Sequence, residues 1–272
     1  MFEIFGLIIL ALIFEGLRRK ILARMHNRTG PPIIQPFYDF QKLFTKEWTS
    51  GKNLVFHFVP PLALLCALLM LFIVPFPFWN FDYSFLVLGY LFILQDTFYI
   101  FGALASGSPF GTHSSIREVI LMVGYEIALL VLITVFFFNY GAVDFTSYTK
   151  EFAFLEMPVA SFLLLMVGMV IVRVTPYDVV NAEPEISAGF FTEYYGIELA
   201  MLELAEFIKN LVFLILIGFL LVGPSYAIIF SPIFLIIYTI SNASSPRSST
   251  FLSLKMFVLV ASIAFIDLFF LV

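Results

Sequence analysis

The sequence contains little charge, one cysteine and three histidines. Only 12% of its 272 residues are charged, whereas about 25% is usual in a soluble domain. Cys66 has no partner for a disulfide within the chain, and His26, His57 and His113 are too scattered for a zinc or iron–sulfur site. The motifs G-x-G-x-x-G, Walker A and G-x-S-x-G do not occur either. No metal or cofactor is expected in this chain, and any redox centre connected with it belongs to another protein.

Hydrophobic residues make up 61% of the chain, and they form long runs. A helix that rises about 1.5 Å per residue needs roughly 20 residues to cross about 30 Å of hydrocarbon. Barrel strands would instead alternate over about ten residues. The sequence therefore predicts an all-α, polytopic membrane protein with about eight transmembrane helices and a single domain, residues 1–272. The runs cover about 2–22, 54–75, 83–104, 117–138, 157–175, 200–222, 224–240 and 251–272.

The distribution of cations predicts an orientation in the membrane. Glu3 lies at the start of the first run and Arg18, Arg19 and Lys20 lie near its end, which is the reverse of a secretory signal. Twelve of the fourteen Lys and Arg residues fall on one side of the predicted helices. By the positive-inside rule, both termini face outward and the two long loops face the cytoplasm. The expected location is the cell membrane.

The first long loop contains an amphipathic segment. Gly30-Pro31-Pro32 ends the first helix, and Pro36 suits the first turn of a new one. Aromatic side chains then share one face, and charged side chains share the other. This pattern predicts a cytoplasmic helix at the membrane interface, serving either as an anchor or as a docking surface for a soluble partner. The aromatic face is Phe37, Phe40, Phe44 and Trp48, and the charged face includes Asp39, Lys42 and Lys46.

The second long loop is acidic. Five carboxylates lie between Thr175 and Leu199, and no Lys or Arg occurs between Arg173 and Lys209. Neighbouring carboxylates repel one another, so some must be protonated, paired with a partner's cations or spread along a hydrated path. A solvated loop is the simpler alternative, but interleaved Phe and Tyr residues disfavour full exposure. The five are Asp178, Glu183, Glu185, Glu193 and Glu198.

Several ionisable residues lie within the hydrophobic runs. Each costs at least about 2.5 kcal/mol at mid-bilayer and usually faces a bundle interior or a water-filled path. Glu206 and Lys209 can pair at i, i+3 as a structural ion pair. Alternatively, polar groups at several depths on adjoining helices form a proton relay. The relay residues would be Asp96, Glu118, Glu126, Glu203, Glu206 and Lys209, whereas Glu3, Glu15 and Asp267 are interpreted as interfacial.

Three motifs resemble a known family. The segment Pro176 to Gly196 resembles the pattern P-F-D-L-P-E-A-E-x-E-L-x-A-G-F-x-x-E-Y-x-G of the membrane junction protein of respiratory complex I, known as its H component. Gln35 to Glu47 resembles the family's Q-P-x-x-D-x-x-K-L-x-x-K-E, and Tyr125-Glu126 resembles its Y-E pair. The motifs occur in the family's order along the whole chain. Counterparts of this protein occur in membrane-bound [NiFe] hydrogenases.

The resemblance implies a non-catalytic subunit of an ion-translocating oxidoreductase complex. Such a subunit anchors a peripheral redox arm and couples electron transfer to proton or sodium translocation through carboxylates. By position, Glu183, Glu185 and Glu193 would line the entrance and Glu126 would continue the path. The remaining path residues, chosen from their place within the runs, are Glu118, Asp96, Glu203, Glu206 and Lys209. Residues facing the peripheral arm would be Asp39, Lys42, Lys46, Glu47 and Asp178.

Departures from the pattern favour the hydrogenase type. Quinone-reducing members read N-R-x-P-F-D, whereas this chain has Arg173-Val174-Thr175-Pro176-Tyr177-Asp178. Ser115-Ile116-Arg117-Glu118 is closer to the hydrogenase-type S-R-E. The expected partners are [NiFe] hydrogenase-like and iron–sulfur subunits that carry the NiFe and iron–sulfur centres, antiporter-like membrane subunits and the lipid bilayer, but no nucleic acid.

Three other functions remain open. The chain could form the quinone chamber of an NADH, F420 or ferredoxin:quinone oxidoreductase. It could be a stand-alone ion transporter, although the inverted repeats and broken helices common in transporters are not evident. A passive membrane anchor would explain the amphipathic segment but not the acids within the hydrophobic runs.

Overall fold

The computed structural model describes residues 2–48, 52–74, 82–142, 144–180, 187 and 189–271. Helices account for all the regular structure within these ranges. Each of the eight hydrophobic runs contains one long helix, which confirms the predicted fold class. The long helices are α1 (Phe2–Met25), α3 (Leu54–Ile73), α4 (Ser84–Ala105), α5 (Pro109–Asn139), α7 (Pro158–Ile171), α9 (Gly196–Leu221), α10 (Ala227–Ser244) and α11 (Thr250–Leu271).

Six of these helices are long and apolar enough to cross a membrane: α3, α4, α5, α9, α10 and α11. The second half of α1 carries Glu15, Arg18, Arg19 and Lys20, and α7 has only 14 residues. The end of α7 at Ile171 falls short of the expected 175. Arg173 has a positive φ of 52°, and Pro176 disfavours helix at the residue before it.

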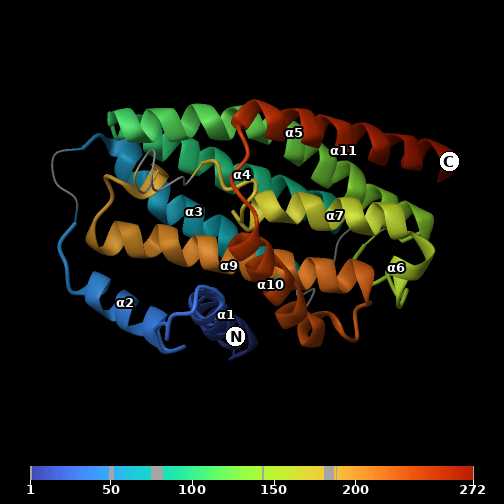
Figure 1. Cartoon of the computed structure of the whole chain (residues 1–272), viewed down its shortest axis with the longest axis horizontal. Helices are drawn as coiled ribbons and strands as arrows, with labels where there is room; N and C mark the ends of the chain where they lie inside the picture. Colours follow the sequence, from blue (N-terminus) through green and yellow to red (C-terminus); the bar gives the residue numbers. More distant parts are fainter. Residues whose placement is uncertain are drawn as a thin grey trace.

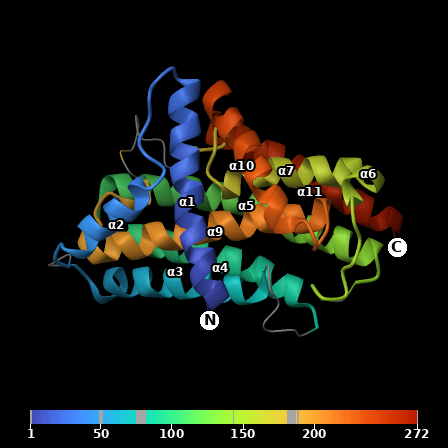
Figure 2. The same ribbon diagram turned by 90° about the horizontal axis from the view of Figure 1, so that it is seen from below.

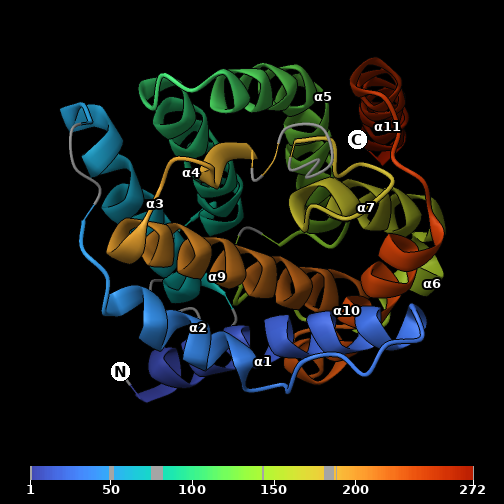
Figure 3. The same ribbon diagram turned by 60° about the vertical axis from the view of Figure 1, so that its left-hand side comes forward.

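The helices pack around α9. Figure 3 shows α9 in the middle of the molecule, with α1 and α2 on one side and α4 and α5 on the other. Of its most apolar 18-residue stretch, 83% is buried, which explains why α9 is hydrophobic on nearly all faces. Helix α11 runs along α5 (Figure 1), and α1 crosses α9 steeply (Figure 2).

The amphipathic segment forms α2 (Gln35–Phe44), as predicted, with Pro36 in its first turn. Its aromatic residues do not act as one face. Phe40 is buried edge-on against Phe207 of α9, with ring centres 5.9 Å apart, whereas Phe44 is 55% exposed. Trp48 lies beyond the end of the helix. The buried side of α2 is Pro36, Phe40 and Leu43, and the helix packs against α9 and α1.

Two short elements complete the described fold. Helix α6 (Ala153–Glu156) precedes α7, and the 3-10 helix η1 (Gly189–Phe191) precedes α9. The ring of Phe190 in η1 lies 6.2 Å from that of Tyr99 on α4. This contact holds the end of the acidic loop against the helix bundle.

Candidate functional site: a buried cluster of carboxylates and cations

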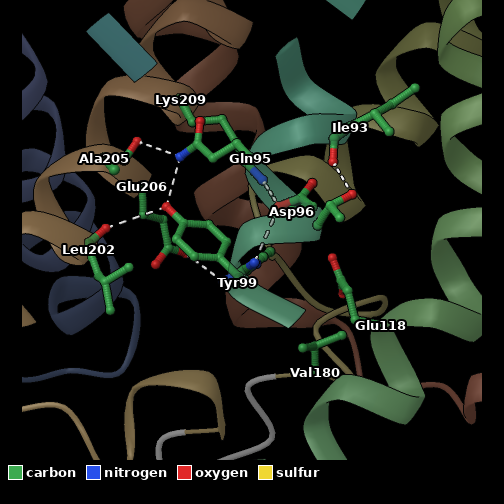
Figure 4. Close-up of polar contacts among 12 residues, drawn as sticks. Ile93, Gln95, Asp96, Tyr99, Glu118, Val180, Leu202, Ala205, Glu206 and Lys209 are labelled. Atoms are coloured by element: carbon green, nitrogen blue, oxygen red, sulfur yellow. Dashed lines mark hydrogen bonds and ion pairs between the residues drawn. The ribbon is translucent and has the colours of Figure 1, made fainter. Parts of the chain in front are cut away.

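Asp96 on α4 is the centre of a charged cluster inside the helix bundle. Only 2% of Asp96 is exposed, and Lys209 of α9 is 1% exposed. The Lys209 ammonium donates to Asp96 Oδ1 at 2.5 Å (Figure 4). Gln95, beside Asp96, donates from Nε2 to the Tyr99 hydroxyl at 2.7 Å and to the Ala205 carbonyl at 3.0 Å. These contacts fix α4 against α9.

Arg173 supplies the second buried cation. It follows α7 and is 8% exposed, and its guanidinium lies 3.5 Å from Asp96 and 3.4 Å from Glu206. Its Cζ lies 5.2 Å from the ring centre of Tyr99 and 5.1 Å from that of Phe190. Burial alone would lower the pKa of Arg173, but the carboxylates of Glu206, Glu118 and Asp96 outweigh it and raise the pKa. Arg173 is therefore a permanent positive charge in the cluster.

Arg173 and Lys209 both pair differently from the sequence-based expectations. The i, i+3 pair of Glu206 with Lys209 was one alternative, yet Lys209 binds Asp96 and Glu206 binds Arg173. The reason is that Lys209 lies on the face of α9 that packs against α4, whereas Glu206 faces Arg173. Arg173, one of the twelve cations assigned to one side of the predicted helices, is buried.

Tyr125 of α5 connects two of the carboxyl groups. Its hydroxyl lies 3.0 Å from Asp96 Oδ2 and 3.1 Å from Glu118 Oε1, and all three residues are buried. Glu126, the next residue, is also buried, and its Oε1 has no hydrogen-bond partner among the described residues. Glu126 interacts electrostatically with Asp96, Glu118 and Lys209. The structure thus brings Asp96, Glu118, Glu126, Glu206 and Lys209 together.

A polar cavity of about 550 Å³ lies beside this cluster. It is bounded by α1, the segment after α7, α9 and α10, and Arg173 and Glu206 line it. Among its other lining residues are Glu15, Arg18, Arg19, Asp178 and Arg247. Glu15 was interpreted as interfacial, but it is 6% exposed and binds Arg18 at 2.7 Å and Arg19 at 2.9 Å. The cavity therefore reaches the buried cluster at Arg173 and Glu206.

Glu203 projects from α9 toward the N-terminal elements. Its electrostatic neighbours include Arg19 on α1, Glu206 on α9 and Asp39 on α2. Asp39 accepts from Arg19 at 2.8 Å and from Gln35 at 2.9 Å. Glu203 therefore lies on the α1 and α2 side of α9, separate from the contacts of Asp96.

The acidic loop is described only in part. Glu183 and Glu185 lie outside the described residues. Glu193 lies 3.3 Å from the ammonium of Lys52, which also donates to the Ser106 carbonyl at 2.8 Å. Asp178 lies 3.4 Å from Arg247. Two carboxylates of the loop thus pair with cations from distant parts of the chain. The sequence of the loop alone could not indicate these pairs.

The predicted partner-facing residues differ in exposure. Lys42 and Glu47 are exposed, and Lys46 lies 4.7 Å from the ring centre of Tyr195. Asp178 has a side chain only 15% exposed and is not part of the surface of α2. Burial raises the pKa of Asp178, and Arg247 and Arg173 offset this effect in part.

Sequence reasoning missed several residues of the site. Arg173, Tyr99, Gln95 and Tyr125 complete the cluster, and Arg18 and Arg19 line the cavity. The polar triplet Gln95-Asp96-Thr97 within an apolar run indicates a buried carboxylate. A buried carboxylate requires a cation nearby, so the triplet also indicates that a cation is part of the site. The position of that cation depends on packing between helices. No group of three His, Cys, Asp or Glu side chains in the described ranges could hold a metal ion.

The fold and the cluster define a polytopic membrane protein with a polar interior. The family model described as NADH dehydrogenase matches residues 1–271, and the chain belongs to this family. It is 30% identical over 217 residues to a putative NADH-ubiquinone oxidoreductase of Methanocaldococcus jannaschii, covering 77% of this chain and 72% of that protein. It is also 30% identical over 218 residues to hydrogenase-4 component C of Escherichia coli, covering 76% of this chain and 69% of that protein.

A solved structure has the same fold. It is that of the membrane-bound sulfane sulfur reductase, an archaeal respiratory membrane complex, and a chain of it matches with a TM-score of 0.89 at 22% identity. The match covers 97% of this chain and 96% of the other. A further relative is an NADH-quinone oxidoreductase subunit of Syntrophobacter fumaroxidans. It is 27% identical over 253 residues, which are 84% of this chain and 76% of that protein.

Proposed function

We propose that this chain is the membrane-arm junction subunit of a multi-subunit oxidoreductase complex, where it couples electron transfer to proton or sodium translocation. Family membership supports this role, because the similar proteins are named as subunits or components of oxidoreductases and a hydrogenase. The buried charges of this chain supply the coupling path, and partner subunits carry the NiFe and iron–sulfur centres.

The bridging hydroxyl of Tyr125 carries the proposal. One hydroxyl has a single hydrogen to donate, yet two carboxyl groups lie within 3.1 Å of its oxygen. The second contact is favourable only if one carboxyl group is protonated and donates to the tyrosine. Asp96 already binds Lys209 and Arg173, so Glu118 is the group that holds this proton. A proton held between two acids by a hydroxyl is the local unit of a relay.

The unpartnered buried atoms support the same role. Five buried side-chain atoms have no hydrogen-bond partner within the described residues, and all five are oxygens. Carboxyl and amide oxygens accept hydrogen bonds. These buried oxygens would therefore be satisfied by a water molecule or, on the acids, by a bound proton. They belong to Gln95, Glu126, Asp178, Glu198 and Asn210.

The path begins at the acidic loop and the polar cavity. We place both on the cytoplasmic side, together with α2, and both termini on the outer side of the cell membrane. The entrance is formed by Glu183, Glu185 and Glu193. The buried path is formed by Asp96, Glu118, Glu126, Glu206 and Lys209. Glu203 adds a carboxylate on the α1 side. Asp39, Lys42, Lys46 and Glu47 face the peripheral [NiFe] hydrogenase-like arm, and antiporter-like subunits receive the path on the membrane side.

The lining of the cavity supports the hydrogenase type over a quinone-binding one. Most residues around it are charged or polar, and Leu22 and Val172 are its apolar members. A long isoprenoid tail would have little apolar surface there. We expect a quinone analogue not to inhibit the assembled complex, and competitive inhibition would favour the quinone-chamber function.

Neutralising single acids tests the coupling function. Glu126→Gln, Glu193→Gln and Tyr125→Phe are expected to leave electron transfer in the assembled complex intact but to lower the number of ions moved per electron in liposomes. Removing one proton-transfer group costs on the order of 100-fold in the rate of that step. Glu151→Gln, at an exposed position, is the control. Unchanged ion-to-electron ratios in all three variants would refute the relay.

A further inference from the structure

A second pair of ionisable residues lies where α3 and α9 begin. His57 is in the first turns of α3, and its Nδ1 forms a hydrogen bond with Glu198 Oε1 in the first turn of α9. The side chain of His57 is 31% exposed, whereas that of Glu198 is 0% exposed. α3 and α9 lie side by side (Figure 1). A partly exposed acid–base group therefore contacts a fully buried carboxyl group directly.

The second oxygen of Glu198 has no partner within the described part of the chain. The neighbouring polar groups are bound elsewhere: the Tyr194 hydroxyl donates to the Phe56 carbonyl at 3.2 Å, and Lys52 pairs with Glu193 at 3.3 Å. The ring of Tyr194 stacks on that of Phe56, with ring centres 3.9 Å apart. Glu198 thus has one oxygen toward His57 and one left for a proton.

The face of α9 that carries Glu198 leads to the central cluster. Residues 198, 202, 205 and 209 follow helical spacing along this face. The Leu202 carbonyl accepts from Tyr99 at 3.4 Å, the Ala205 carbonyl accepts from Gln95 at 3.0 Å, and Lys209 binds Asp96 (Figure 4). Eleven residues at about 1.5 Å each separate Glu198 from Lys209 by about 16 Å. Polar groups line the far part of this interval.

We infer that His57 and Glu198 form a lateral proton entrance to the relay, separate from the acidic loop. Solvent delivers a proton to Nε2 of His57 as Nδ1 passes its proton to the Glu198 carboxylate. A turn of the ring about Cβ–Cγ then brings the remaining N–H toward Glu198 for the next transfer. Imidazole suits this step because its two nitrogens accept and release protons on opposite sides of the ring, near neutral pH. The inference rests on the proposed function, since the proton must have a relay to enter.

Two substitutions test the entrance in the assembled complex reconstituted in liposomes. His57→Ala and Glu198→Gln are expected to lower the rate of ion transport by about tenfold, less than the 100-fold loss in rate for a sole proton-transfer group, because the loop entrance remains. His113→Gln is the matched control, since His113 is exposed on α5 and outside the relay. Added imidazole is expected to restore at least half of the transport of His57→Ala.

The outcomes separate the two proposals. If Glu126→Gln and Glu193→Gln uncouple the complex while His57→Ala and Glu198→Gln behave like wild type, the entrance is refuted and the relay stands. If none of the four uncouples, the relay itself fails. A loss of transport in His57→Ala that imidazole does not restore would make the pair a structural connection between α3 and α9, and this too overturns the inference. His57 is partly exposed, so His57→Ala is expected to assemble even if Glu198→Gln does not.

Discussion

Arg173 shows how the environment of a single residue stabilises a buried charge. Its guanidinium lies between the carboxylates of Asp96 and Glu206 and between the rings of Tyr99 and Phe190. Each carboxylate in turn depends on this cation, because an unpaired charge in a low-dielectric interior costs several kcal/mol. Arg173 therefore compensates two carboxylates of the cluster at once.

Replacing Arg173 should destabilise the fold strongly. Arg173→Gln leaves Glu206 without its cation and is expected to cost about 3 to 5 kcal/mol in the free energy of unfolding. Arg247→Gln is the comparison and should cost less, because the Arg247 side chain is 31% exposed and that of Arg173 is 7% exposed, so water can replace more of the lost contact. Denaturant unfolding of the purified chain in detergent measures both. Similar costs for the two variants would contradict a special role for Arg173.

We expect Asp178 to make a pH-dependent contribution to the stability of the fold. Because burial raises its pKa in the folded chain, the folded state holds this proton more tightly than the unfolded state does. The stabilisation from that proton is complete below about pH 4, the unfolded value, and is lost as the pH rises through the raised folded value. Asp178→Asn should therefore raise the midpoint of thermal unfolding more at pH 7.5 than at pH 4. The exposed Asp82→Asn is the control, and an equal change at both pH values would contradict the prediction.

At the level of the elements, helix positions were predictable and their pairings were not. All eight hydrophobic runs contain helices, because a helix satisfies the backbone hydrogen bonds of an apolar segment internally. The cluster depends instead on which faces of α4, α5 and α9 meet, and helical spacing within one segment does not determine this. Lys209 therefore pairs with Asp96, 113 positions away, rather than with Glu206.

At Gly16, two elements contact each other closely because glycine has no Cβ. A Cβ at Gly16 would lie 1.9 Å from the Ile33 carbonyl oxygen, so only glycine lets the segment before α2 return against α1. Gly6, on the same helix, has nothing within 4 Å of such a Cβ. This close approach positions α2 and its charged residues beside α9.

Gly16→Ala and Gly6→Ala should consequently have opposite effects. Gly16→Ala forces the backbone apart and is expected to cost about 1 to 3 kcal/mol. Gly6→Ala should gain up to about 1 kcal/mol, because alanine loses less backbone entropy in a helix. Unfolding measurements report both changes, and limited trypsin cleavage at the exposed Arg28 reports displacement of the segment. Unaltered cleavage and stability in Gly16→Ala would show that the segment adjusts without strain.

For the whole molecule, the charged surface and the proposed relay lie near each other. α2 and the starts of α3 and α9 gather at one end of the molecule, and α6 lies at the other end (Figure 1). Gly196, at the start of α9, is packed so closely on the segment after α2 that a Cβ there would lie 2.1 Å from the Glu47 carbonyl oxygen. A partner bound to α2 would therefore bind an element that packs directly on α9, which carries Glu198, Glu206 and Lys209.

This proximity predicts that α2 controls assembly with the peripheral arm. Lys42→Glu combined with Lys46→Glu reverses two charges at this end and is expected to weaken the binding of the peripheral subunits about tenfold at low salt, since steering by surface charge falls with ionic strength. Glu151→Lys, at the end near α6, is the control, because it is exposed and also reverses a charge. Copurification at about 50 and 500 mM salt measures the effect, which should shrink at the higher concentration as the Debye length falls. If the double variant retains its peripheral subunits as wild type does, α2 is an anchor for this chain alone, and the partner must contact the entrance through the acidic loop instead.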